Sequence, residues 1–191
     1  MKQITKTICV VLFSTAYVSL YAQTDQQAMM KAWNEFMTPG QIHQMMAKDD
    51  GEWKTEISMW MEPGAAPATS TGKCVNKMIL GGRYQQSQFS GDFMGMPMEG
   101  LGTMGYDNAK KIFVSSWIDN LGTGVMLMEG KWDEGSKTIH FTGNQTDPMT
   151  GKDMPIRETF KYIDNNNQLM EMYTTHEGKE HKMMEIKFTR L

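Results

Sequence analysis

Cysteine is nearly absent from this chain of 191 residues, which contains only Cys9 and Cys74. Cys9 falls in an N-terminal segment that we expect to be removed, so the mature domain would keep one thiol and form no internal disulfide. The simplest interpretation of Cys74 is a small buried apolar side chain, and the alternative is a reactive or intermolecular thiol. The domain must therefore be stabilised by its core rather than by covalent links.

Clusters of positive charge are also missing. The chain has 19 Lys and Arg residues against 22 Asp and Glu, a formal net charge of −3, and the basic residues are scattered. A protein that binds nucleic acid or an anionic membrane through its charge needs a basic patch. We therefore expect neither nucleic acid nor a membrane surface as a partner.

Long apolar runs are absent except near the N-terminus. Residues 8–18 form an apolar run that follows Lys2 and Lys6 and precedes the small residue Ala22. The run is well short of the ~20 residues that a membrane span requires, and the order of features is typical of a signal peptide. The sequence thus predicts a signal peptide over residues 1–22, no membrane span, and export to the periplasm or the medium. Gln23 stands where a lipid anchor would need Cys.

The first part of the expected mature chain, residues 23–50, has a helical pattern. Apolar residues recur there at spacings of three and four, as on one face of a helix: Met29, Met30, Trp33, Phe36 and Met37. Thr38-Pro39 restarts the pattern, with Thr suited to an N-cap and Pro to the first helical position. We expect one or two short helices that end before Gly51.

From Gly51 onward the period changes to two, which indicates half-buried strands. Trp53, Thr55 and Ile57 alternate with charged residues, and clusters of Gly, Asn and Asp interrupt the pattern every 10–13 residues or so. Besides the strand that starts at Gly51, strands are predicted over about 70–80, 83–90, 98–106, 111–119, 123–132, 137–146, 155–163, 168–176 and 180–190.

A run of strands with short connections and no helix between them favours an antiparallel up-and-down β-barrel, which leaves no exposed edge. We predict a mainly β domain over 51–191, a lipocalin-like or calycin-like barrel of about 8–10 strands; a β-sandwich is the alternative. Glycines inside the predicted strands would serve as bends at the barrel corners: Gly95, Gly100, Gly102 and Gly105.

With the strands placed, several short motifs follow one another in order: Gly51-Glu52-Trp53, Gly81-Gly82-Arg83, the glycine-rich stretch 100–107, and Trp117-Ile118-Asp119. The order resembles a secreted bacterial family catalogued as domain of unknown function 1579, over roughly residues 45–191. The resemblance implies a calycin-type barrel and brings no activity, cofactor or catalytic residue. The glycine-rich stretch is not a dinucleotide fingerprint, because strands flank it on both sides.

Methionine is the most over-represented residue, with 21 copies. Thioethers are soft ligands that suit Cu(I), and the cluster Met94, Met96 and Met98 makes a weak candidate metal site. The spread of methionine over nearly every predicted strand instead favours an adaptable core or cavity lining. We therefore predict no cofactor and no metal site elsewhere.

Catalytic patterns are poorly represented. None of the four histidines has a partner at metal-ligand spacing, so hairpin exposure is the simplest reading, with haem binding through one of them a remote alternative. No G-x-S-x-G motif occurs, and the carboxylates alternate with Lys along the strands, as on a solvated face. A catalytic pair is not indicated, although a small cavity enzyme remains an alternative.

The strands over 83–90 and 155–163 carry mixed polar and apolar residues on both faces, whereas a filled core would require one apolar face. A ligand-binding barrel lines its interior with aromatic residues and a few polar anchors. The candidate ligand-binding residues are Trp53, Tyr106, Trp117 and Tyr173, with Arg83 and Arg157 as anchors for a carboxylate or another anion. The sequence thus predicts a barrel that binds a small, apolar or amphipathic ligand. The alternative is an interaction scaffold that acts through loops 63–70 and 91–100, and the oligomeric state is open.

Overall fold

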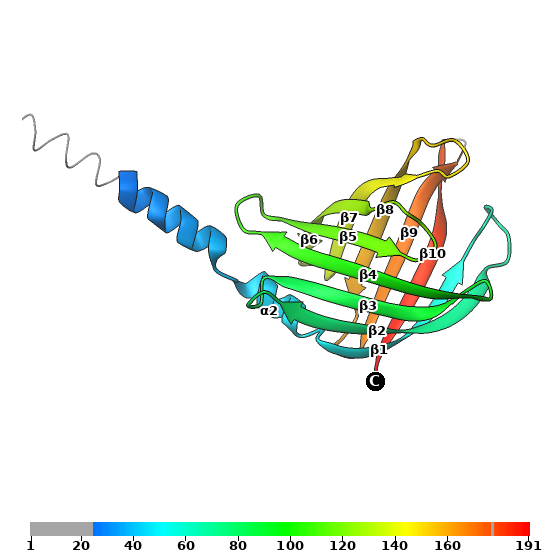
Figure 1. Ribbon diagram of the computed structural model, residues 1–191, viewed down its shortest axis with the longest axis horizontal. Coiled ribbons are helices and arrows are strands. Elements are labelled where there is room, and N and C mark those ends of the chain that lie inside the picture. The colour runs from blue at the N-terminus through cyan, green and yellow to red at the C-terminus, as the bar shows by residue number, and fades with distance from the viewer. Residues whose placement is uncertain (1–24, 177) are drawn as a thin grey trace, which may run out of the picture. The chain divides into compact units, whose positions relative to one another are not determined.

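The structure is a computed structural model that describes residues 25–176 and 178–191. The chain divides after Thr38 into two units, and Pro39–Leu191 forms the second. That unit contains α2 (Gln41–Ala47) and ten strands (Figure 1). The strands are β1 (Gly51–Met59), β2 (Ala68–Ile79), β3 (Tyr84–Phe93), β4 (Met96–Asp107), β5 (Ile112–Asp119), β6 (Met126–Asp133), β7 (Thr138–Thr146), β8 (Asp153–Tyr162), β9 (Asn167–His176) and β10 (Lys179–Arg190).

The ten strands form a closed antiparallel barrel in which each strand pairs with its neighbours in sequence. The ring closes between β1 and β10, where Trp53 pairs with Arg190 and Met59 with Met184. A bulge in β10 between Lys182 and Met184 shifts the register against β9. Closure leaves no unpaired edge between the first and last strands. The predicted up-and-down barrel is therefore confirmed, and the sandwich alternative is wrong.

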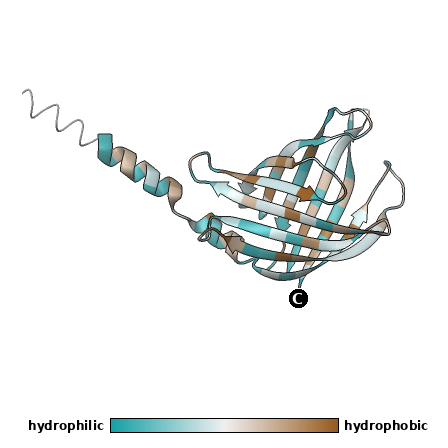
Figure 2. Ribbon diagram, in the orientation of Figure 1, coloured by the Kyte–Doolittle hydropathy of each residue, from teal (hydrophilic) through white to brown (hydrophobic). Residues whose placement is uncertain are grey.

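Hydrophilic and hydrophobic residues are interspersed along the strands (Figure 2), and the burial pattern of β1 distinguishes an inner from an outer face. In β1, Trp53, Thr55 and Ile57 are buried, while Lys54 and Glu56 are exposed and form an ion pair of 2.8 Å. Inward residues pair with inward residues across each ladder, because directly opposed side chains lie on the same face of a sheet. Once one residue is known to point inward, the register of the strand pairs assigns the inward positions on the other strands.

Helix α2 closes one end of the barrel. Met46 is completely buried, and its carbonyl accepts a 2.7 Å hydrogen bond from the Gln85 side chain of β3. The Trp53 indole donates to the Asp49 carbonyl at 2.9 Å. The Arg190 guanidinium stacks on the Trp53 ring, 4.2 Å from its centroid, and donates to the Lys48 and Asp50 carbonyls. These contacts join α2, the first strand and the last strand into a floor.

Two of the glycines expected to bend the barrel, Gly100 and Gly105, make room for aromatic rings. A Cβ at Gly100 would lie 2.2 Å from the Trp117 ring, and one at Gly105 would lie 2.7 Å from the Tyr84 ring. Gly95 occupies the β3–β4 turn with φ +84°, a conformation that L side chains rarely adopt. At Gly102 a Cβ would have ordinary contacts of 3.4 Å and more.

The other unit contains a helix over residues 25–37, as the apolar spacing predicts. Trp33 and Phe36 pack edge to face on it, with ring centroids 5.9 Å apart, and Lys31 pairs with Glu35. Neither this helix nor α2 has the length and apolar character needed to cross a bilayer. The expected signal peptide, residues 1–22, lies outside the described residues.

Candidate functional site

The barrel interior is densely packed in one part and keeps solvent-accessible surface in another. A buried cluster on the β5–β9 wall packs against Met46 of α2, with Phe113 and Phe141 at its centre. Other inward positions keep solvent-accessible surface that no side chain covers. Half-buried inward residues lie on β3, β4, β5, β9 and β10: Ser87, Gly102, Met104, Ser115, Met170, Met184 and Ile186. The space that they surround is the lumen, closed by α2 at one end.

Methionine lines much of this lumen, as the sequence predicts. Inward methionines on seven strands are Met59, Met78, Met104, Met126, Met128, Met154, Met170, Met172 and Met184. Thioether side chains are flexible and polarisable, so they adapt to ligands of different shape. The weak metal candidates lie at the end opposite α2, where Met94 and Met96 are exposed in the β3–β4 hairpin and Met98 is half-buried on β4.

Three of the six predicted ligand-binding residues face the interior. Tyr106 lies near α2, with its ring centroid 5.0 Å from that of Phe113. Trp117 lies nearer the other end, and its indole donates a 2.8 Å hydrogen bond to Asp119. Trp53 is fully buried in the floor beneath Arg190. Tyr106 and Trp117 therefore contribute to the lumen wall, whereas Trp53 is part of the closed end.

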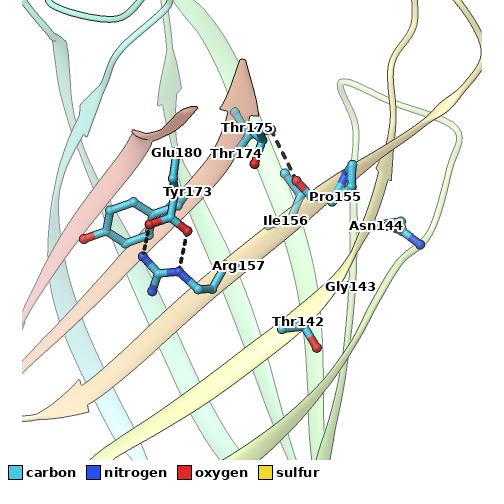
Figure 3. A pocket seen from close by; sticks show the side chains of 10 residues that line it. All are labelled: Thr142, Gly143, Asn144, Pro155, Ile156, Arg157, Tyr173, Thr174, Thr175 and Glu180. Atoms are coloured by element: carbon cyan, nitrogen blue, oxygen red, sulfur yellow. Dashed lines mark hydrogen bonds and ion pairs between the residues drawn. The ribbon is translucent and has the colours of Figure 1, made fainter. Parts of the chain in front are cut away.

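The other three candidates do not line the lumen, which corrects the expectation of an arginine anchor inside. Arg83 is exposed in the β2–β3 turn and donates to the Leu80 carbonyl. Arg157 and Tyr173 are register partners on the outer face of β8 and β9, and the guanidinium lies 3.9 Å from the ring centroid. Glu180 holds Arg157 from β10 through two hydrogen bonds of 2.7 and 2.8 Å (Figure 3).

Arg157 and Tyr173 lie beside a cleft in the barrel wall (Figure 3). The β8–β9 ladder ends at Ile156 and Thr174, because Pro155 has no N–H to continue it. The neighbouring ladders run further, so the β7–β8 and β9–β10 hairpins separate here. The cleft has a volume of about 430 Å³, and residues of both faces line it: Thr142, Gly143, Asn144, Pro155, Ile156, Arg157, Tyr173, Thr174, Thr175 and Glu180.

Glu158 is an acidic residue that faces the lumen, which corrects for this residue the expectation that the carboxylates alternating with Lys lie on a solvated face. Its register partners are Phe141 on β7 and Met172 on β9, both buried. The carboxylate has no hydrogen-bond or ion-pair partner among the residues that the structure describes, and burial alone raises its pKa to about 7. The sequence feature that indicates an inward Glu158 is its position between Ile156 and Phe160, on the more apolar face of that strand.

Cys74 and Asp119 are two further polar residues on the inner face of the barrel. The Cys74 thiol is buried beside Asn76, at 3.4 Å from its side-chain oxygen, and burial raises the pKa of the thiol to about 11. This confirms the interpretation of Cys74 as a buried apolar residue. Asp119 accepts hydrogen bonds from the Leu121 and Gly122 amides as well as from Trp117.

Two solved structures have the same fold at low sequence identity. Rv2717c from M. tuberculosis superposes with a TM-score of 0.60 and 12% identity, covering 81% of this chain and 99% of that one. The S-type phycobiliprotein lyase CPES from Guillardia theta superposes with a TM-score of 0.53 and 8% identity, covering 82% of this chain and 95% of that one. No curated protein sequence matches significantly. The model of the family described as "Protein of unknown function (DUF1579)" matches residues 38–190, and the chain belongs to that family.

Proposed function

We propose that the protein binds a small, partly apolar ligand in the barrel lumen. The observation that carries this proposal is the set of inward side chains with uncovered surface, such as Ser87, Ser115 and Met170. A barrel that served only as a scaffold would fill this space, because protein interiors otherwise pack as densely as organic crystals. The likeness to a phycobiliprotein lyase contributes the fold alone.

Burial of apolar ligand surface would supply most of the affinity. Each Å² of apolar surface removed from water contributes about 25 cal/mol, so a ligand that buries ~300 Å² would gain ~7 kcal/mol before entropic costs. Half-buried inward side chains such as Met104, Met170 and Ile186 offer apolar contacts, and the methionines adjust to the outline of the ligand. Polar groups in the wall, such as Ser87 and Ser115, would set its orientation.

Two adjacent serines on β5 provide a matched test. Ser115 faces the lumen and pairs with Met104 and Met128, whereas Ser116 faces outward and pairs with Thr103 and Leu127. Ser115→Phe should fill the lumen and weaken binding of the neutral apolar fluorophore N-phenyl-1-naphthylamine at least tenfold, while Ser116→Phe should bind like the wild type. Equal binding by both variants, or no binding by the wild type, would refute lumen binding.

We further propose that the protein acts outside the cytoplasm, as the expected signal peptide over residues 1–22 supports. N-terminal sequencing of the protein from its host should find a chain that starts at Gln23. A chain that retains residues 1–22 in the cytoplasm would refute this localisation.

A cavity enzyme is a second candidate, because a carboxylate that titrates near neutrality inside a cavity is a common catalytic feature. Glu158 fulfils that condition. Its register partners Phe141 and Met172 are apolar, so the second polar group that acid–base chemistry requires would have to come from the ligand. Chemical conversion of a bound ligand by the wild type, and not by Glu158→Gln, would favour this candidate.

A further inference from the structure

Two charged side chains on the inner face are already engaged. Arg190 lies in the floor, where its guanidinium stacks on Trp53 and donates to the Asn165, Asp50 and Lys48 carbonyls. Asp119 lies toward the other end and accepts three hydrogen bonds within the described residues. Between these two levels lies Glu158.

Glu158 reaches the lumen from the middle of β8. Its partners Phe141 and Met172 belong to the buried cluster, and that cluster also contains Ile156 on the same strand face. Glu158 keeps solvent-accessible surface, although its register partners on both sides are apolar. A molecule inside the lumen can therefore reach this residue.

Among the described side chains of β7 and β9, no charged group faces Glu158; further along the wall, an inward titratable residue of β10 is His181, which pairs with Thr174. The inward residues of β7 next to Glu158 are Ile139, Phe141 and Gly143, and those of β9 are Met170, Met172 and Thr174. The next inward titratable residue on β8 is Tyr162, whose pKa burial raises well above its usual value. On the opposite wall, β3 presents the neutral side chains of Gln85, Ser87 and Phe89.

An ionised carboxylate in apolar surroundings is costly unless a hydrogen bond or an opposite charge compensates it. The described residues supply neither to Glu158. We infer that the lumen selects apolar molecules that carry a cationic amine group, which Glu158 holds as an ion pair; this inference rests on the proposed ligand-binding function. The interior charge is opposite to the one that Arg83 and Arg157 suggested from the sequence, because both arginines lie outside the lumen.

The ion pair also makes binding depend on pH. Burial raises the pKa of Glu158 to about 7, so the ionised fraction of the free protein is ~0.9 at pH 8 and ~0.03 at pH 5.5. An alkylamine remains protonated over this whole range. Its apparent affinity should therefore fall toward that of Glu158→Gln between pH 8 and pH 5.5, by at most roughly 30-fold.

The test uses three fluorescent probes that differ only in their end group: dansylated C11 chains that end in an amine, an alcohol or a carboxylate. Fluorescence titrations at pH 8 compare the wild type with Glu158→Gln and with the control Glu56→Gln, an exposed acid on the outer face of β1. We expect the wild type and the control to bind the amine roughly tenfold or more tightly than the alcohol, as for a charge-assisted hydrogen bond. Glu158→Gln should lose this preference, keep its affinity for the alcohol, and show no dependence on pH.

The outcomes separate the inference from the proposed function. If the alcohol binds and Ser115→Phe abolishes that binding, the lumen is the site; equal affinity for the amine and the alcohol, or a preference for the carboxylate, then overturns the inference alone. A preference for the amine that survives Glu158→Gln also overturns it. If no probe binds the wild type, both the inference and the proposed function fail.

Discussion

Replacing Glu158 with Gln should stabilise the barrel at pH 8 and have little effect at pH 5. Glutamine keeps the shape of the side chain and removes the charge. In the folded protein burial raises the pKa of Glu158 from 4.5 to about 7. A carboxyl group with a raised pKa favours folding fully below its unfolded-state pKa, and this contribution is lost as the pH rises through about 7.

The size of the effect follows from the shift in pKa. One pKa unit corresponds to 1.36 kcal/mol. The raised pKa therefore lowers the free energy of unfolding of the wild type by about 3 kcal/mol at pH 8 and by less than ~1 kcal/mol at pH 5. Glu158 is only half-buried, which lowers the expected gain at pH 8 to about 2–3 kcal/mol. Burial also raises the pKa of Asp49 to about 7. Asp49 is present in both proteins, so their difference reports on Glu158.

Urea unfolding followed by tryptophan fluorescence at pH 5 and pH 8 provides the measurement. The free energy of unfolding of Glu158→Gln, minus that of the wild type, should increase between the two pH values by about 2 kcal/mol. Glu56→Gln should show no such gain, because Glu56 is exposed and hydrogen-bonded to Lys54, which lowers its pKa. A difference that is independent of pH, or a variant less stable than the wild type at pH 8, would refute the assignment of Glu158 as an uncompensated carboxylate.

Three further predictions concern packing. Met46→Ala should lower the free energy of unfolding by about 2–5 kcal/mol, because Met46 is fully buried where α2 closes the barrel. An unchanged urea midpoint would contradict the closure of the barrel by α2. Gly100→Ala should cost about 1–3 kcal/mol and alter Trp117 fluorescence, since its Cβ would overlap the Trp117 ring, whereas Gly102→Ala should be tolerated. Cys74 should react with a thiol reagent such as DTNB only after unfolding, because the thiol is buried and burial raises its pKa; rapid reaction of the native protein would contradict this.

The barrel was predictable because its signals are local. Alternation of apolar and polar residues marks a strand, and clusters such as Asp133-Glu134-Gly135 mark the turns, without information from distant parts of the chain. In the structure the Asp133 side chain accepts from the Gly135 and Ser136 amides in that turn. The buried character of Cys74 was predictable for a similar reason, since a lone cysteine is usually a small apolar residue.

Local sequence patterns did not determine which residues of the mixed strands point inward. On β8, Ile156, Glu158 and Phe160 alternate with Arg157 and other polar residues, so both faces contain charge. Moving the register by one residue exchanges the faces. The pairing of Glu158 with buried Phe141 and Met172 removes this ambiguity, because it fixes the register of β8 against the strands on both sides.

The sequence alone therefore determined the number and order of the strands, the helical segment before them and the abundance of thioether side chains available for a lining. Only the tertiary structure decided that the lumen keeps uncovered surface, that α2 closes one end, and that the unpaired interior charge is Glu158 rather than an arginine. The physical reason is that strand formation depends on local alternation, whereas the content of a barrel depends on the register at which ten strands close into a ring.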